Sequence, residues 1–247
     1  MSGEIRDQLA PTGVLRAGIN MANKLLVTGV TSLGEPDGVG PELARHIANG
    51  LGVRVVYVEF GTPGELADAV KEGVWDIGLI GAEPTRAEKI SFTAAYVEIE
   101  ATYLVPGGSL LTTVDEVDSE GVRIAVSGRS AYDLYLSRSL KHAELHRARG
   151  LPGALELFLT KKMEALAGLR PALSGDLDKV PGGRILKGRF TAVQQAVGTA
   201  RAKVEAASYL WDVIEDAKAS GLIAGLIEKH DVIGRLSVAA PHKCEDR

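Results

Sequence analysis

Segments with a strand pattern and segments with a helix pattern alternate along residues 13–80, and this order constrains the fold more than any other feature. The strand patterns cover 13–20, 53–60 and 76–80, and the helix patterns cover about 41–52 and 64–72. In the first helix, Leu43, Ile47 and Leu51 recur every four residues and form one apolar face. An order in which strands alternate with helices requires a parallel sheet covered by helices. The sequence therefore predicts an α/β fold.

The strand at 76–80 breaks at Gly81, and a polar turn with one acid, Glu83, and one base, Arg86, follows it. Gly81 allows the backbone to come close to a ligand beyond the carboxyl end of the strand, where ligands of open α/β sheets usually lie. Arg86 offers a planar fork of donors that suits a carboxylate or a phosphate. The alternative is that Arg86 is a solvated turn residue paired with Glu83 or Glu88.

The same stretch resembles the signature of the family 3 extracellular solute-binding proteins, the amino-acid receptors of ABC importers. In that family a strand that starts at Asp and ends in Gly leads to a turn with Arg and then to an Ile-x-Phe-Ser/Thr-x-x-Tyr segment. Asp76, Gly81 and Arg86 match the first part, and residues 90–96 match the second. The resemblance spans about residues 10–231 and implies that Arg86 clamps the α-carboxylate of a ligand. The turn before Arg86 is shorter than usual, which leaves the contacts of Glu83 open.

The resemblance implies a type II periplasmic-binding-protein fold, in which two crossing hinge strands join two α/β lobes and the ligand lies in the cleft between them. We place the crossing strands at 97–103 and 190–198. Lobe one would then contain residues 1–98 and 192–247, and lobe two residues 99–191.

A second candidate site is the strand-to-helix turn Ser127-Gly128-Arg129-Ser130. The free N–H groups at the start of a helix, together with the helix dipole, favour an anion. The resemblance implies that this turn supplies the second half of the carboxylate grip, through Gly128, Arg129 and Ser130. Ser130 is equally well explained as an ordinary N-cap, which needs no ligand.

The segment 163–171 departs from the family pattern. Amino-acid receptors of the family usually place an Asp here that holds the α-ammonium group of the ligand, whereas this chain has Gly168, Leu169 and Arg170. A buried ammonium group without a charge partner would cost several kcal/mol. We therefore expect an organic acid or a modified amino acid as the ligand, with Gly168 and Arg170 as candidate contacts.

Two further candidates lie where family members often contact the ligand, in the loop after the first strand and at the end of the second. Asn20 and Asn23 stand in that loop, and Phe60 could form a wall of the site, as could Gln194 and Gln195 near the return strand. The alternatives are that both Asn residues are plain loop formers and that the others are ordinary strand residues.

Several classes of function are disfavoured by composition. The net charge of −4 and the aromatic content of 5% argue against nucleic-acid binding, and no apolar run is long enough to span a membrane. The single cysteine, Cys244, excludes an intrachain disulfide. The histidines are expected on helix faces or in the tail, with His142 and His146 on one helix face, and no acid completes a metal motif there. We predict no catalytic residue, no cofactor and no metal site.

The leading hypothesis is a monomeric, non-catalytic protein that binds a small carboxylate-bearing solute and delivers it to an ABC transporter in the membrane. One alternative is an enzyme on the same scaffold, similar to cyclohexadienyl dehydratase, with Glu83 as an acid. Another is a cytoplasmic ligand sensor.

The two ends of the chain give less information. Residues 1–9 show no signal peptide. The family is periplasmic or extracellular, so either a signal peptide has been removed or the protein stays in the cytoplasm. Residues after about 232 carry no clear pattern and are expected to pack loosely.

Overall fold

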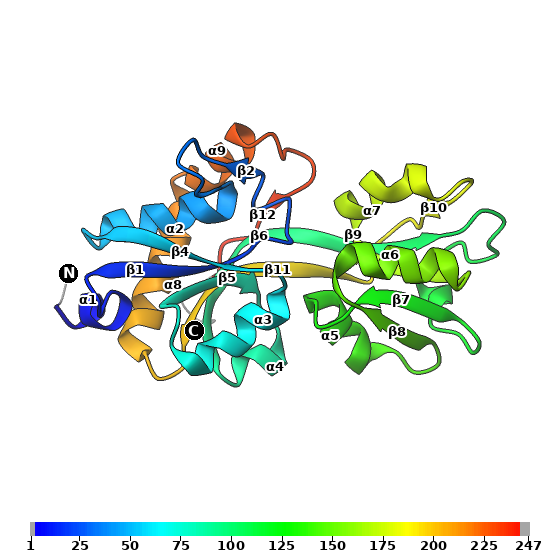
Figure 1. Cartoon of the computed structure of the whole chain (residues 1–247), viewed down its shortest axis with the longest axis horizontal. Coiled ribbons are helices and arrows are strands. Elements are labelled where there is room, and N and C mark those ends of the chain that lie inside the picture. The colour runs from blue at the N-terminus through cyan, green and yellow to red at the C-terminus, as the bar shows by residue number, and fades with distance from the viewer. Residues whose placement is uncertain (1–2, 243–247) are drawn as a thin grey trace. The chain divides into compact units, whose positions relative to one another are not determined.

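The computed structural model describes residues 3–242, so Cys244 lies outside the described part of the chain. The described chain forms two compact units (Figure 1). Unit 1 contains residues 3–98 and 194–242, and unit 2 contains Ile99–Val193. Two strands, β6 (Ile90–Val105) and β11 (Thr191–Ala200), contain residues of both units. The predicted α/β class with two crossing strands is confirmed.

Unit 1 is built around a sheet in which β1 lies between β4 and β5 and is parallel to both. Strand β11 joins the other side of β5 in the antiparallel direction. Helix α2 packs on β1 and β4, and α3 packs on β1 and β5. The elements of this unit are α1 (Gly3–Leu9), β1 (Val14–Asn20), β2 (Gly29–Val30), β3 (Pro36–Asp37), α2 (Val39–Gly50), β4 (Arg54–Phe60), α3 (Pro63–Asp68), η1 (Ala69–Glu72), β5 (Ile77–Gly81), α4 (Pro84–Ala87), α8 (Val204–Ala219), α9 (Leu222–Lys229) and β12 (Ser237–Val238).

Asp76, the first residue of the family signature, has a structural role in unit 1. Its side chain is fully buried and accepts hydrogen bonds from the backbone N, Nε and Nη2 of Arg16, at 3.0, 2.9 and 2.8 Å. Lys203, directly before α8, adds an ion pair at 3.4 Å. A buried carboxylate is tolerated only when it is paired in this way, so Asp76 joins β1, β5 and the start of α8 rather than contacting a ligand.

Unit 2 repeats the strand order of unit 1, because β7 lies between β8 and β9 and is parallel to both. Strand β9 in turn pairs with β6 in the antiparallel direction. Apolar clusters lie around Tyr103 and Phe158. The elements of unit 2 are η2 (Asp115–Val117), β7 (Arg123–Ser127), α5 (Ala131–Ser139), β8 (Glu144–Ala148), α6 (Gly150–Thr160), β9 (Ala165–Leu169), α7 (Arg170–Asp176), η3 (Leu177–Lys179) and β10 (Arg184–Ile185), together with parts of β6 and β11.

The predicted helix that carries both His142 and His146 is wrong. Helix α5 ends at Ser139, His142 lies in a loop, and His146 lies on β8. The carboxylate of Asp118 accepts hydrogen bonds from the backbone N–H groups of residues 141, 142 and 143, at 2.8–3.1 Å. Because these N–H groups are bonded to Asp118, they do not continue helix α5. The chain turns instead into β8, which lies beside β7.

We expect Asp118→Asn to lower the stability of unit 2 at neutral pH, by about 0.5–1 kcal/mol because the carboxylate is close to solvent. Burial raises the pKa of Asp118, but the hydrogen bonds from residues 141–143 lower it by more, so this pKa lies below its ordinary value of 3.8. A carboxyl group with a lowered pKa stabilises the fold above about pH 4 and loses this contribution as the pH falls further. Urea unfolding at pH 7 and pH 3 measures the change.

The difference in the free energy of unfolding between wild type and Asp118→Asn should therefore be smaller at pH 3 than at pH 7. The control is Asp115→Asn, which removes the same charge from an exposed position on η2. A destabilisation that is equal for both variants, or that is unchanged at pH 3, would contradict this role of Asp118.

Both ends of the described chain are more ordered than the sequence suggested. Helix α1 was not predicted, and its Leu9 is fully buried. Residues 237–238 form β12 on the edge of β6, and Leu236 and Ala239 are buried. The expectation of loose packing after about residue 232 is thus wrong for residues 236–239. No helix among the described residues is both long and apolar enough to cross a membrane.

Candidate functional site

Three of the predicted residues of unit 1 lie at the carboxyl ends of neighbouring parallel strands. Asn20 ends β1, Phe60 ends β4 directly opposite it, and Gly81 ends β5. Ile19 is paired with Leu79, so the ends of β1 and β5 lie at the same level of the sheet. This edge is where ligands of open α/β sheets bind.

Arg86 lies next to this edge, on the single helical turn α4. Pro84 starts the turn with the fixed φ angle that suits a first helical position. The Arg86 side chain donates from Nη1 to the carbonyl oxygen of Gly81 at 2.7 Å, and Arg86 is only 6% exposed. It is therefore not a solvated turn residue. Glu83 is also buried, and its carbonyl oxygen accepts a hydrogen bond from the N–H of Arg86 at 2.9 Å.

A small cavity of about 10 Å³ lies behind this edge and is lined in part by Asn20, Asn23, Tyr96 and Gln195. Its volume matches about one water molecule, so a solute could reach it only with a single polar group. Asn20 and Asn23 both accept from backbone N–H groups two residues further on, at 3.2 Å, which is the loop-forming role considered above.

Tyr96 is a candidate for a ligand contact that the sequence did not suggest. Its side chain is fully buried, and its hydroxyl group has no hydrogen-bond partner among the described residues. Burial raises the pKa of this hydroxyl group, so the group stays protonated and can donate. A buried polar group of this kind is expected to meet a water molecule or a ligand atom.

Phe60 packs mainly on the apolar core of unit 1, against a cluster that includes Leu66, Trp75 and Ile80. The next residues form an N-cap, in which Thr62 and Glu65 make a reciprocal capping box at the start of α3. Packing and capping thus account for the end of β4, and a ligand contact of Phe60 stays a prediction.

The turn in unit 2 is already held by hydrogen bonds within the protein. The N–H of Gly128 donates to Ala148, that of Arg129 donates to Oδ2 of Asp133 at 2.7 Å, and that of Ser130 donates to Ser127. Ser130 caps α5 by accepting from the N–H of Asp133 at 3.1 Å. An anion at Gly128, Arg129 and Ser130 would have to replace these bonds, because the N–H groups at these three positions are already engaged, and the binding role of the turn stays a prediction.

Asp133 and Arg147 hold this turn, and the sequence analysis missed both. Asp133 is buried and accepts from Nε of Arg147 at 2.9 Å. Arg129 adopts a φ of +62°, a conformation that is uncommon for a residue with a side chain. The Asp133 carboxylate therefore occupies the position that a bound anion would take at the N–H of Arg129.

Gly168 and Arg170 have structural roles in unit 2. A Cβ atom at Gly168 would lie 2.9 Å from Cδ2 of Leu173, so only glycine fits there without rearrangement. Arg170 donates from Nε to Glu100 at 2.7 Å and from its other nitrogens to the carbonyl oxygens of Leu186 and Gly188. Arg170 could still offer its positive charge to a ligand, but its donors are largely engaged.

An arginine follows each of the three parallel strands of unit 2. Arg129 comes two residues after β7, Arg149 directly after β8, and Arg170 directly after β9. The register pairs Ser127 with Ala148, so these carboxyl ends lie at one edge of the sheet. Three arginines thus stand at this edge of unit 2, and one of them, Arg170, is paired with Glu100 at 2.7 Å. Arg149 could have been found from the sequence only by knowing that β8 is a strand.

One group of side chains outside both edges has the chemistry of a metal site. Asp37, Glu42 and His230 of unit 1 bring one ligand atom each to within 4.8 Å of the others. It is the one group of this kind among residues 3–242.

Comparison with known proteins gives the same picture of the fold. The sequence profile of the bacterial extracellular solute-binding proteins of family 3 matches residues 18–231. No curated protein matches the sequence.

Solved structures are similar at low sequence identity. A mutant of ArgBP from T. maritima has a TM-score of 0.73 and 20% identity, over 92% of this chain and 99% of that one. The solute receptor for L-cysteine of Neisseria gonorrhoeae has a TM-score of 0.77 and 18% identity, over 97% and 100%. The ancestral amino-acid-binding protein AncCDT-1, a precursor of cyclohexadienyl dehydratase, has a TM-score of 0.72 and 20% identity, over 90% and 97%.

Proposed function

The chain belongs to family 3 of the bacterial extracellular solute-binding proteins, and from this premise we propose that it binds a small carboxylate-bearing solute and presents it to an ABC transporter. The observation that carries the proposal is Arg86. A nearly buried guanidinium group, fixed to the carbonyl oxygen of Gly81, lies next to the carboxyl ends of three parallel strands. Arginine with a restricted geometry is suited to bidentate recognition of a carboxylate.

We further propose that the ligand is an organic acid or a modified amino acid without a free α-ammonium group. Leu169 ends β9 at the position where amino-acid receptors of the family carry an Asp. Arginines 129, 149 and 170 follow the three strand ends of unit 2, while the buried acid of this region, Asp133, is bonded to Arg147. This distribution favours negative charge on the ligand and offers no carboxylate at position 169 for an ammonium group.

The resemblance also suggests that the protein acts outside the cytoplasm, as a monomer. Unit 2 would bind an anion through the 127–130 turn, after Asp133 releases the N–H of Arg129, or through its arginine side chains. Anion contacts of either kind would be weakened by salt if they are exposed.

A thermal-shift screen tests the proposal. Glutarate, succinate and longer carboxylates are compared with the amino acids that match them, such as glutamate and aspartate. A ligand at about 100 times its dissociation constant adds about 2.7 kcal/mol of stability, which clearly raises the unfolding midpoint. We expect the carboxylates to raise it and the amino acids to leave it unchanged.

This screen tests the solute-binding function and the class of ligand separately. A midpoint raised by ordinary amino acids would keep the solute-binding function and overturn the argument from Leu169. A midpoint that no carboxylate or amino acid raises would contradict the binding function itself.

A second candidate function is a dehydratase, because one similar structure is a precursor of cyclohexadienyl dehydratase. Glu83 would be the acid, since it is buried and lies on the same turn as Arg86. Conversion of prephenate or arogenate by wild type but not by Glu83→Gln would favour this function. Tight binding without turnover would dismiss it.

A further inference from the structure

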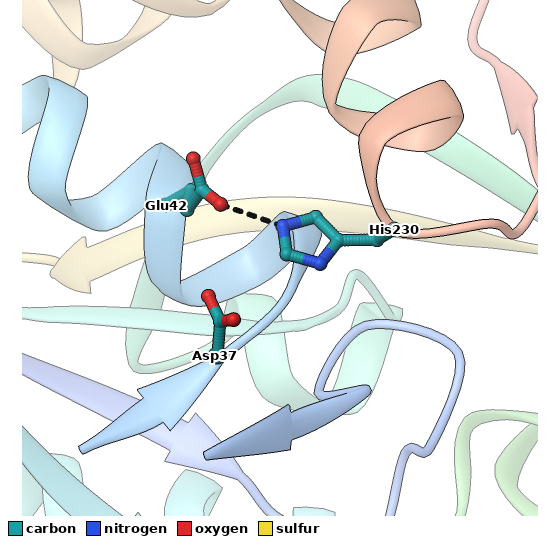
Figure 2. Close-up of side chains that lie close together, drawn as sticks. All are labelled: Asp37, Glu42 and His230. Carbon is teal, nitrogen blue, oxygen red and sulfur yellow. Dashed lines mark hydrogen bonds and ion pairs between the residues drawn. The ribbon is translucent and has the colours of Figure 1, made fainter. Parts of the chain in front are cut away.

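Asp37, Glu42 and His230 come from three segments of unit 1 that lie far apart in the sequence. Asp37 ends β3, Glu42 lies in the first turn of α2, and His230 follows the last residue of α9. Figure 2 shows their polar ends directed toward one another. One donor atom from each lies within 4.8 Å of the others. In a tetrahedral zinc site with bonds of about 2.0–2.2 Å, ligand atoms lie roughly 3.3–3.6 Å apart, so small movements would suffice.

The imidazole of His230 is oriented as a metal-binding histidine requires. Its Nδ1 lies 3.1 Å from the hydroxyl oxygen of Thr28, while Nε2 faces Glu42 at 2.7 Å (Figure 2). When Nδ1 carries the proton and donates to Thr28, the lone pair of Nε2 is directed at the two carboxylates. A hydrogen bond to the second ring nitrogen is the usual way in which proteins fix a ligating histidine. The His230 side chain is only 6% exposed, so this orientation is held by packing.

The charge balance of the cluster also favours a cation. Asp37 and Glu42 bring two negative charges, and Lys229, which pairs with Glu42 at 2.7 Å, brings one positive charge. One net negative charge remains when the imidazole is in the neutral form that binds a metal. Lys229 is 61% exposed and can therefore turn into solvent when a divalent ion takes its place. The Glu42 carboxylate, at 15% exposure, would stay in position.

We propose that Asp37, Glu42 and His230 form a binding site for a divalent cation of the zinc type, with Thr28 as the residue that positions His230. One nitrogen and two carboxylate oxygens suit Zn²⁺ better than Ca²⁺ or Mg²⁺, which prefer oxygen ligands alone. Water would complete the coordination. A bound ion would join the β2–β3 hairpin to α2 and to the end of α9, and would therefore stabilise unit 1.

The site is tested by titrating the chelator-treated full chain with ZnCl₂ in a calorimeter. The protein carries Cys244→Ser, because a thiolate in the tail could bind zinc independently. We expect one Zn²⁺ per chain and a raised unfolding midpoint. Asp37→Asn and His230→Gln should each weaken binding at least tenfold, and Thr28→Ala about tenfold. His146→Gln should change nothing, since His146 lies in unit 2, where it is paired with Glu144 at 3.4 Å.

Asp37→Asn keeps the test valid if His230→Gln does not fold. The Asp37 carboxylate accepts locally from the N–H of Gly38, and an amide oxygen can replace it there. The proposal is overturned if the protein takes up no Zn²⁺ near a ratio of one, or if Asp37→Asn and His146→Gln bind it equally well. Binding of Ca²⁺ in preference to Zn²⁺ would overturn the zinc-type assignment. If the protein takes up no Zn²⁺ near a ratio of one, the cluster is only an internal network of hydrogen bonds and ion pairs.

Discussion

Arg86→Ala is expected to weaken binding of the carboxylate ligand by at least about 100-fold, which corresponds to roughly 2.7 kcal/mol. The physical reason is that a hydrogen bond to a charged group contributes about 1.5–3 kcal/mol, and the guanidinium fork can make two of them to one carboxylate. Arg86→Lys keeps the charge but loses the planar fork, so it should fall between wild type and Arg86→Ala. Calorimetric titration with the best carboxylate from the screen measures these affinities.

The same change also removes the partner of the Gly81 carbonyl oxygen, which Arg86 meets at 2.7 Å. An unpaired buried carbonyl group costs about 1–3 kcal/mol of folding stability. The ligand affinity of the variant must therefore be measured at a temperature below the unfolding midpoint of the variant. Arg54→Ala is the matched control, because Arg54 is exposed at the opposite, amino end of β4. Equal affinities for wild type and a folded Arg86→Ala would remove Arg86 from the site and leave the proposed function without its main support.

The arrangement of unit 1 could be predicted because its signals are local. An apolar run such as 77–80 and a helix face such as Leu43, Ile47 and Leu51 each reflect burial on one side of a single element. The order of these elements then allows few topologies. Strands β1, β4 and β5 accordingly lie within one residue of the predicted segments.

The failures involve contacts between residues far apart in the sequence. Residues 141–143 leave the helical path because Asp118, more than twenty positions earlier, accepts their N–H groups. Strand β12 exists only because the edge of β6 is available to it. A tertiary partner can override a local pattern in this way, and a single sequence does not show where the partner lies.

The residues of the candidate site fall into the same two groups, those in a local motif and those that only the fold brings together. Gly81 and Arg86 belong to one short motif, and the structure places them in direct contact, although their role in binding stays a proposal. The turn at 127–130 was also recognised from its motif, but its hydrogen bonds depend on Asp133 and Arg147, which only the folded chain brings together. The group of Asp37, Glu42 and His230 has no motif at all, because β3, α2 and α9 meet only in the fold.

Gly38→Ala is expected to destabilise unit 1 by about 3–5 kcal/mol, the largest effect that we predict for a single methyl group. Gly38 lies between β3 and α2 with φ +144° and ψ −179°, a region that only glycine enters without strain of about 1–3 kcal/mol. A Cβ atom there would lie 2.3 Å from the carbonyl oxygen of Leu26 and 2.9 Å from the nitrogen of Thr28. Both contacts are backbone atoms that cannot rotate away, which adds about 1–3 kcal/mol of overpacking.

The variant Gly34→Ala distinguishes the cost of backbone strain from the cost of a steric clash. Gly34 also has a positive φ, +79°, but a Cβ atom there would meet nothing within 4 Å. That variant should therefore lose only about 1 kcal/mol, the cost of a left-handed conformation for a residue with a side chain. At about 2–4 °C per kcal/mol, the unfolding midpoint should fall by roughly 6–20 °C for Gly38→Ala and by about 2–4 °C for Gly34→Ala. Equal shifts would show that the backbone near Leu26 can move aside, and that the β3–α2 junction is less rigid than its contacts indicate.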